Sequence, residues 1–191
     1  TSAAGTAALG NTVGVFLESA GNTIGGTTPG AGNVISGNQD GISLPRFAAN
    51  NLVLGNLIGT DATGTIDLGN TQNGIYVEGT NNTIGGTTPE ARNVISGNNV
   101  YGVRLNTSRS IWNLVQGNFI GTNGAGTGAL RNSGVGVAVS TNASNNTIGG
   151  AASGTGNVIS GNGAGVVIQQ APGNQVLGNL IGTQADGASP L

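Results

Sequence analysis

The sequence predicts an all-β solenoid, and three observations support this prediction. A phrase of the form Gly–Ile/Val–x–Leu/Val/Ile recurs six times in the 191 residues, with successive copies 27 to 34 residues apart. Hydrophobic residues make up 36% of the chain and fall at alternate positions, which is typical of half-buried strands. No segment keeps a helical period. Internal repeats of this length indicate stacked turns that bury one another's faces. The copies begin at Gly14, Gly41, Gly74, Gly102, Gly136 and Gly165.

Each repeat contains three short strands. The recurring phrase is the first, and two Asn-led segments follow it, such as NTIGG at 22–26 and NVISGN at 33–38. Three strands per turn, with the turns stacked in parallel, make a parallel β-helix, and six turns at about 4.8 Å give a rod about 29 Å long. We expect one domain over residues 1–191, with 1–12 as an edge or partial turn and 14–191 as six turns. Since the chain lacks Met, we expect it to be part of a larger protein.

The inward columns follow from the alternation of apolar residues. Like residues stack on like, and β-branched side chains suit such a crowded interior. The first strand contributes two columns, Val15, Ile42, Ile75, Val103, Val137 and Val166, then Leu17, Leu44, Val77, Leu105, Val139 and Ile168. The second and third strands contribute Ile24, Val53, Ile84, Val115, Ile148 and Val176, then Ile35, Ile58, Ile95, Ile120, Ile159 and Ile181. At one corner we expect a ladder of stacked amides formed by Asn33, Asn56, Asn93, Asn118, Asn157 and Asn179.

Composition excludes several classes of function. Charged residues are only 6% of the chain, and the net charge of −2 argues against nucleic acid, which requires clustered basic residues. No apolar run approaches the roughly 20 residues that span a bilayer, so we expect no membrane insertion. The chain has no Cys and no His, which removes disulfides, thiolate metal sites and the commonest general base. We expect no cofactor and no metal.

The pattern G-I-x-L…N-x-I-x-x-N-x-I-x-x-N resembles the right-handed parallel β-helix repeat of pectate-lyase-like proteins. The phrase TIGGTTPGAGNVISGN is similar to repeats of bacterial secreted and cell-surface β-helix proteins, and the resemblance covers the chain from about Thr12 onward. It implies a right-handed coil and an extracellular or cell-surface location. It leaves function open, because this superfamily includes lyases, hydrolases, epimerases, glycan-binding modules, adhesins and stalks.

The outward side of the first strands carries the candidate binding residues. One row is Phe16, Ser43, Tyr76, Arg104, Ala138 and Val167, and the next is Glu18, Pro45, Glu78, Asn106, Ser140 and Gln169. Aromatic rings stack on sugar rings, while carboxylate and guanidinium groups pair with hydroxyls. We therefore expect a polysaccharide site made by Tyr76, Glu78 and Arg104, extended by Phe16 and Glu18, with Arg46 close by. The alternative is a solvated face with ordinary surface charges.

The outward row of the third strands is entirely apolar: Val34, Leu57, Val94, Phe119, Val158 and Leu180. An exposed row of this kind calls for an explanation. Odd turns carry an insertion before the third strand, and even turns carry a longer one after it. The even-turn insertions contain Ile66, Leu68 and Leu130, which we expect to fold over the row. The alternative is a face for self-association or for another partner.

Taken together, these features favour a non-catalytic extracellular module that presents a rigid face for polysaccharide binding or adhesion. The main alternative is a structural stalk, and the next is part of a polysaccharide lyase or hydrolase. For hydrolysis, Glu18 and Glu78 lie two turns apart, about 9.6 Å, at the outer limit for a carboxylate pair. Asp61, Thr63, Thr65 and Asp67 only faintly resemble a calcium loop. Ice binding is less favoured, because Leu52, Leu114 and Gln175 interrupt the row of Thr23, Thr83 and Thr147.

Overall fold

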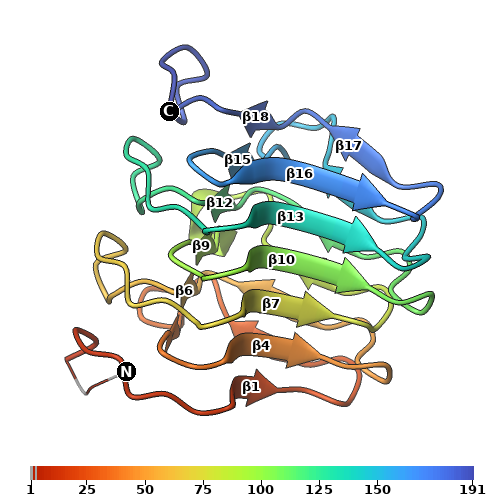
Figure 1. The fold of residues 1–191 in the computed structure, drawn as a ribbon, viewed down its shortest axis with the longest axis horizontal. Coiled ribbons are helices and arrows are strands. Elements are labelled where there is room, and N and C mark those ends of the chain that lie inside the picture. The colour runs from red at the N-terminus through yellow and green to blue at the C-terminus, as the bar shows by residue number, and fades with distance from the viewer. Residues whose placement is uncertain (1, 3) are drawn as a thin grey trace.

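The computed structural model describes residue 2 and residues 4–191, and it is a right-handed parallel β-helix of about six turns (Figure 1). Residues 1 and 3, which the predicted domain includes, lie outside the described residues. The chain forms three parallel sheets of six strands each. The first sheet contains β1 (Val13–Phe16), β4 (Asp40–Leu44), β7 (Asn73–Val77), β10 (Tyr101–Asn106), β13 (Val135–Ser140) and β16 (Ala164–Gln169).

The second and third sheets are built from shorter strands. The second contains β2 (Thr23–Gly25), β5 (Leu52–Leu54), β8 (Thr83–Ile84), β11 (Leu114–Val115), β14 (Thr147–Gly149) and β17 (Gln175–Leu177). The third contains β3 (Val34–Ile35), β6 (Leu57–Ile58), β9 (Val94–Ile95), β12 (Phe119–Ile120), β15 (Val158–Ile159) and β18 (Leu180–Ile181). Among the residues described, the helical content is one 3-10 turn, η1 (Pro89–Ala91), and no helix has the length and apolarity to cross a bilayer.

The strand register confirms the inward columns. Ile42 pairs with Ile75, and Ile75 pairs with Val103, so each turn sets its apolar residue on the equivalent residue of its neighbours. Ile95 and Ile120, in the middle of the rod, are fully buried. In the last turn Ile168, Val176 and Ile181 are exposed, because the described chain places no turn over them. Burial of the columns is therefore greatest in the middle turns.

Three asparagine ladders run along the rod, whereas the sequence analysis identified one. The predicted ladder from Asn33 to Asn179 is present, and in all three the side-chain Nδ2 donates to Oδ1 of the next rung over 2.8–3.3 Å. The two further ladders are Asn22, Asn51, Asn82, Asn113, Asn146 and Asn174, and Asn11, Asn38, Asn70, Asn98, Asn132 and Asn162.

Each inner rung satisfies its amide completely. Asn118 Nδ2 donates to Asn157 Oδ1 at 3.0 Å and to the Ile84 carbonyl at 2.9 Å, and Asn118 Oδ1 accepts from Asn93 Nδ2 at 2.9 Å. Asn118 is fully buried. Because buried polar groups are costly unless hydrogen-bonded, these ladders fix the corners of every turn and make the rod rigid.

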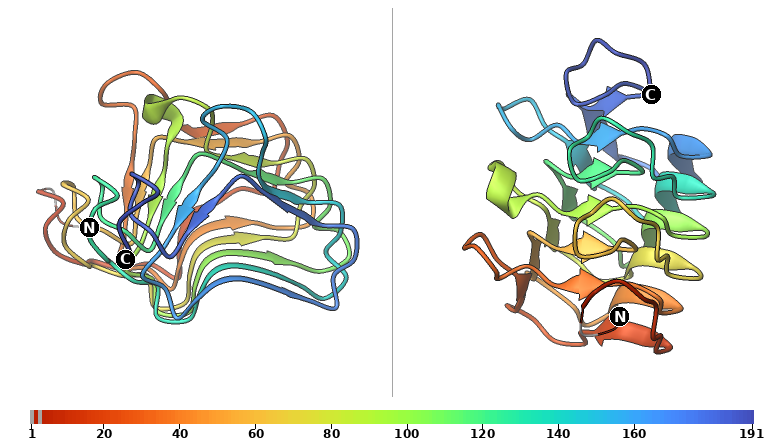
Figure 2. Two further views of the ribbon diagram at one scale, coloured as in Figure 1. Left: turned by 90° about the horizontal axis from the view of Figure 1, so that it is seen from above. Right: turned by 90° about the vertical axis from the view of Figure 1, so that its left-hand side faces the viewer.

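Two series of loops leave the rod on different sides, as its end-on view shows (Figure 2, left). In the even-turn series, the loop backbones stack on one another: Gly124 N–H donates to the Gly64 carbonyl at 2.8 Å, and Ala185 N–H donates to the Gly126 carbonyl at 2.9 Å. The isolated bridge between Thr60 and Asp67 closes the first of these loops as a small antiparallel hairpin. Each series therefore lies along one side of the rod (Figure 2).

The even-turn loops cover part of the apolar outer row of the third sheet. Val94, Phe119 and Val158 are buried, and Leu57 and Leu180 are partly buried beside them. Of the three side chains expected to cover the row, Leu68 and Leu130 are half-buried and Ile66 is exposed.

Loop backbone and one arginine side chain contact Phe119 in this row. A methyl group added at Gly126 would meet Phe119 Cζ at 2.8 Å, while the Arg92 guanidinium lies 4.0 Å from the centre of the same ring. Ile66, expected to fold over the row, is 57% exposed. A glycine backbone can approach the row closely because it has no side chain, whereas the Ile66 side chain points into solvent. Self-association through the row stays a prediction.

Candidate functional site on the outer face of the first sheet

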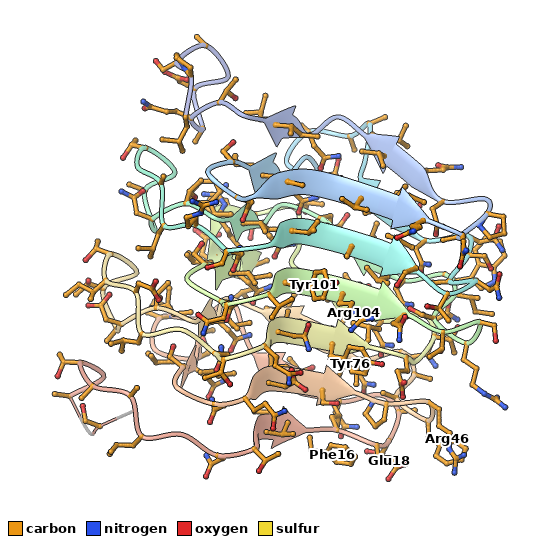
Figure 3. The ribbon with its side chains drawn as sticks, viewed as in Figure 1. Phe16, Glu18, Arg46, Tyr76, Tyr101 and Arg104 are labelled. Carbon is orange, nitrogen blue, oxygen red and sulfur yellow. The ribbon has the colours of Figure 1, made fainter. Side chains whose placement is uncertain are left out.

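Three side chains from two adjacent strands form a cluster on the outer face of the first sheet (Figure 3). Tyr76 on β7 pairs in register with Arg104 on β10, and the Tyr101 ring, from the start of β10, lies beside the Arg104 side chain. The guanidinium carbon of Arg104 lies 5.8 Å from the centre of the Tyr76 ring and 5.0 Å from that of the Tyr101 ring. Both distances lie within the range of a cation–π contact, so two aromatic rings flank one cation.

A chain of hydrogen bonds fixes Tyr76 across three turns. The Tyr76 hydroxyl donates to Glu78 Oε1 at 2.9 Å and accepts from Asn106 Nδ2 at 3.0 Å. Asn106 Oδ1 in turn accepts from the Ser140 hydroxyl at 3.0 Å. Burial raises the pKa of Tyr76, and the Glu78 carboxylate raises it further, so the phenol stays protonated at neutral pH. The ring is therefore held in a fixed orientation.

Arg104 has an unsatisfied donor. Its Nε is buried and has no hydrogen-bond partner among the residues described. Buried donors without partners are uncommon, and each one requires an explanation. Arg104 also lines a cavity of about 440 Å³. The cavity exists because Ala138 and Val167, which continue the Arg104 row in the next two turns, are smaller than the arginine. An acceptor atom of a ligand in this cavity would lie beside the Arg104 side chain.

The other predicted site residues lie apart from this cluster. Phe16 belongs to β1 and is 59% exposed, and buried Ser43 separates it from Tyr76 in the row. Glu18 follows β1 in the first turn of the rod. Arg46 lies near the margin of the sheet (Figure 3). The Arg46 guanidinium stacks on Phe47 at 4.4 Å. Tyr76, Glu78 and Arg104 thus gather as expected, while Phe16 and Glu18 occupy a separate place two turns away.

Tyr101 and the cavity were missing from the sequence analysis. We began each first strand at the glycine of the recurring phrase, so the residues just before it were left out. In the structure, Tyr101 pairs with Asn73 and Val135. Tyr101 lies three residues before Arg104, so strict alternation would place it inward with Val103 and Leu105. The alternation of the sequence therefore gave no signal that its ring lies beside Arg104.

In the loop from Asp61 to Asp67, the Asp61 carboxylate accepts hydrogen bonds from the loop itself. Asp61 Oδ1 accepts from the N–H groups of Thr65 and Ile66, both at 2.9 Å, and Oδ2 accepts from the Thr63 hydroxyl at 2.6 Å. Burial alone raises the pKa of Asp61, but these hydrogen bonds outweigh it and lower the pKa to about 2. Within residues 2 and 4–191, no three His, Cys, Asp or Glu residues gather as a group that could hold a metal ion.

Comparisons with protein-family models, curated proteins and solved structures each found no match for the chain. Its relation to pectate-lyase-like proteins therefore stays a prediction from the repeat pattern. Function has to be inferred from the surface of the rod.

Proposed function

We propose that this chain is a carbohydrate-binding β-helix module of the pectate-lyase-like type, which acts outside the cell or at its surface. It would present the outer face of the first sheet to a polysaccharide. The observation that carries the proposal is the unpartnered, buried Nε of Arg104, which lies between two tyrosines and beside a cavity. After a rotation of the Arg104 side chain that exposes Nε to the cavity, a sugar oxygen would satisfy that donor, and a sugar ring would pack against an aromatic face.

The geometry of the rod supports binding along its axis. Successive strands lie about 4.8 Å apart, close to the length of one sugar ring, so a chain along the axis would meet a new side chain at about every ring. The hydrogen-bonded ladders and the fixed Tyr76 ring make the face rigid before binding. Pre-organisation reduces the entropy lost on association, but we expect weak binding because the face is shallow.

The proposal can be tested by affinity electrophoresis against a panel of plant and bacterial polysaccharides. We expect at least one to retard the wild type. Arg104→Gln should weaken that binding about tenfold, because a charge-assisted hydrogen bond contributes about 1.5–3 kcal/mol. Arg131→Gln is the matched control, since Arg131 is exposed and lies outside the cluster. Tyr76→Ala should weaken binding more than Glu78→Gln, because stacking area outweighs one partly exposed hydrogen bond.

Two outcomes would contradict the proposal. If no polysaccharide retards the wild type, the structural stalk becomes the better interpretation, since the asparagine ladders alone suffice for a rigid spacer. If Arg104→Gln binds as well as the wild type, the site lies elsewhere on the rod. Reducing-end analysis of each bound polysaccharide after incubation separates binding from cleavage.

A further inference from the structure

The corner before the second sheet contains one residue that breaks its pattern. In each turn, the residue preceding the ladder that begins at Asn22 adopts a left-handed backbone conformation. Five of the six are Gly or Asn, with φ from 54° to 74°: Gly21, Asn50, Asn81, Asn145 and Gly173. The sixth is Trp112, with φ of 59°.

A left-handed conformation suits Gly and is tolerated by Asn, but it is unfavourable for a large side chain. The surrounding structure imposes it on Trp112. Asn81 N–H donates to the Ile111 carbonyl at 3.0 Å, and Asn113 Nδ2 donates to the Gly79 carbonyl at 2.9 Å, so the turn repeats the path of its neighbours. Unfavourable backbone conformations that persist in this way are concentrated at ligand sites.

The Trp112 side chain contributes little to the core. It is 60% exposed, and it is the only tryptophan in the chain. In its row, Asn81 lies one turn before it and Asn145 one turn after it, and both are exposed. An indole with an amide on each side combines a flat apolar surface with hydrogen-bonding groups. A protein interface would instead surround a central tryptophan with other apolar contacts.

We propose that Trp112 is a stacking platform for an uncharged sugar unit of a polysaccharide, with the side chains of Asn81 and Asn145 bonding its hydroxyls. The flanking residues in the row are amides without charge, which fits a neutral sugar. This contact is separate from the Tyr76–Arg104 cluster and does not rest on it. It lies on the corner loop that follows β10, so one long polysaccharide can reach both places.

The single tryptophan makes the site directly observable by fluorescence. The full chain is titrated with soluble xyloglucan, mixed-linkage β-glucan, galactomannan and arabinoxylan while emission and acrylamide quenching are recorded. We expect at least one of them to shift the emission to the blue and to protect the indole from acrylamide. If none changes the fluorescence, the proposal is wrong.

Trp112→Asn provides the sharper test, because it restores the residue type found in neighbouring turns. We expect it to raise Tm by about 2–4 °C, since a conformational penalty of about 1 kcal/mol is relieved. The same variant should lose at least tenfold in affinity for the polysaccharide that shifts the fluorescence, measured by affinity electrophoresis. A fall in Tm would show a structural role, and unchanged affinity would show that Trp112 does not bind sugar. Either result overturns the proposal.

Two control variants separate the possibilities. Phe47→Ala removes another exposed aromatic, 57% exposed, that Arg46 already stacks on, and its affinity should equal that of the wild type. An equal loss in Phe47→Ala would mean that any exposed aromatic suffices, which contradicts a defined platform at Trp112. Tyr76→Ala should require more polysaccharide for binding, but at saturating polysaccharide its fluorescence shift should be as large as that of the wild type. If Tyr76→Ala shows no shift at saturation, Trp112 is not an independent contact.

Discussion

The inner residues of the first sheet are alike from turn to turn, whereas the outer residues differ in every turn, although the two sets alternate along the same strands. The inner column through Ile75 consists only of valine and isoleucine. The outer row through Tyr76 contains phenylalanine, serine, tyrosine, arginine, alanine and valine in successive turns. An inner residue meets the same neighbours in every turn, so the same residue type fits each time. An outer residue is free of that constraint, and the chemistry specific to this chain is found there.

The largest loss of stability is expected when a charge is placed inside the rod. Ile95 is fully buried in the middle of its column, and Ile95→Asp should unfold the chain. An unpaired buried carboxylate costs several kcal/mol, comparable to the whole stability of a domain. Circular dichroism and thermal melting measure the result. A Tm within one or two degrees of the wild type would show that the inward assignment is wrong.

A smaller loss is expected from the ladders. Asn118→Ala removes the acceptor of the Asn93 N–H and Nδ2 groups and the donors to Asn157 Oδ1 and the Ile84 carbonyl. The buried Asn93 N–H is then left without a partner, and the other three groups each lose one hydrogen bond. We expect the free energy of unfolding to fall by about 3–5 kcal/mol, at about 1–3 kcal/mol for each unsatisfied group. Asn99→Ala, at an exposed asparagine, is the matched control and should change stability by less than about 0.5 kcal/mol. Equal effects in denaturant titrations would contradict a structural role for the ladder.

The smallest stability effect concerns the first even-turn loop and depends on pH. The folded pKa of Asp61 is about 2, below its ordinary value of 3.8, so its carboxylate stabilises the fold above about pH 4 and loses that contribution as pH falls toward 2. Asp61→Asn keeps an acceptor and removes the charge. Asn123 already holds the next even loop in this way, where its Oδ1 accepts from Thr127 N–H at 3.0 Å.

We therefore expect Asp61→Asn to be less stable than the wild type by about 1–2 kcal/mol at pH 6. The difference should shrink as pH falls from about 4 to 2. Denaturant titrations at several pH values measure it. A difference that is constant with pH would show that the carboxylate charge has no part in holding the loop.

Repetition explains how much of the fold could be predicted from the sequence. The inward columns and the ladder from Asn33 were predictable because they recur at fixed distances from the same phrases. The ladder through Asn70 and Asn132 was hidden, because in even turns these residues lie inside long insertions. The contacts over Phe119 were also hidden, because they come from the backbone at Gly126 and from the Arg92 guanidinium.

The candidate site was less predictable, because a site is made by departures from the repeat. Alternation placed Tyr76 and Arg104 in one row, and the spacing of two residues placed Glu78 beside Tyr76. The unsatisfied Nε of Arg104 depends on how the side chain packs, and no pattern of residue types reveals that. The conformation of Trp112 was hidden as well, although its place in a column of Asn and Gly was visible in the sequence.

Ile75 and Tyr76 are neighbours on β7 with opposite orientations, so a paired measurement on them tests the central claim most directly. Ile75→Ala should lower Tm by about 5–15 °C, because it leaves a cavity in the core. At a temperature where it remains folded, it should still bind the polysaccharide that retards the wild type. Tyr76→Ala should keep Tm within about 3 °C and lose most of that binding. The opposite pattern, with binding lost in Ile75→Ala and retained in Tyr76→Ala, would contradict the division between a scaffold inside and a binding face outside.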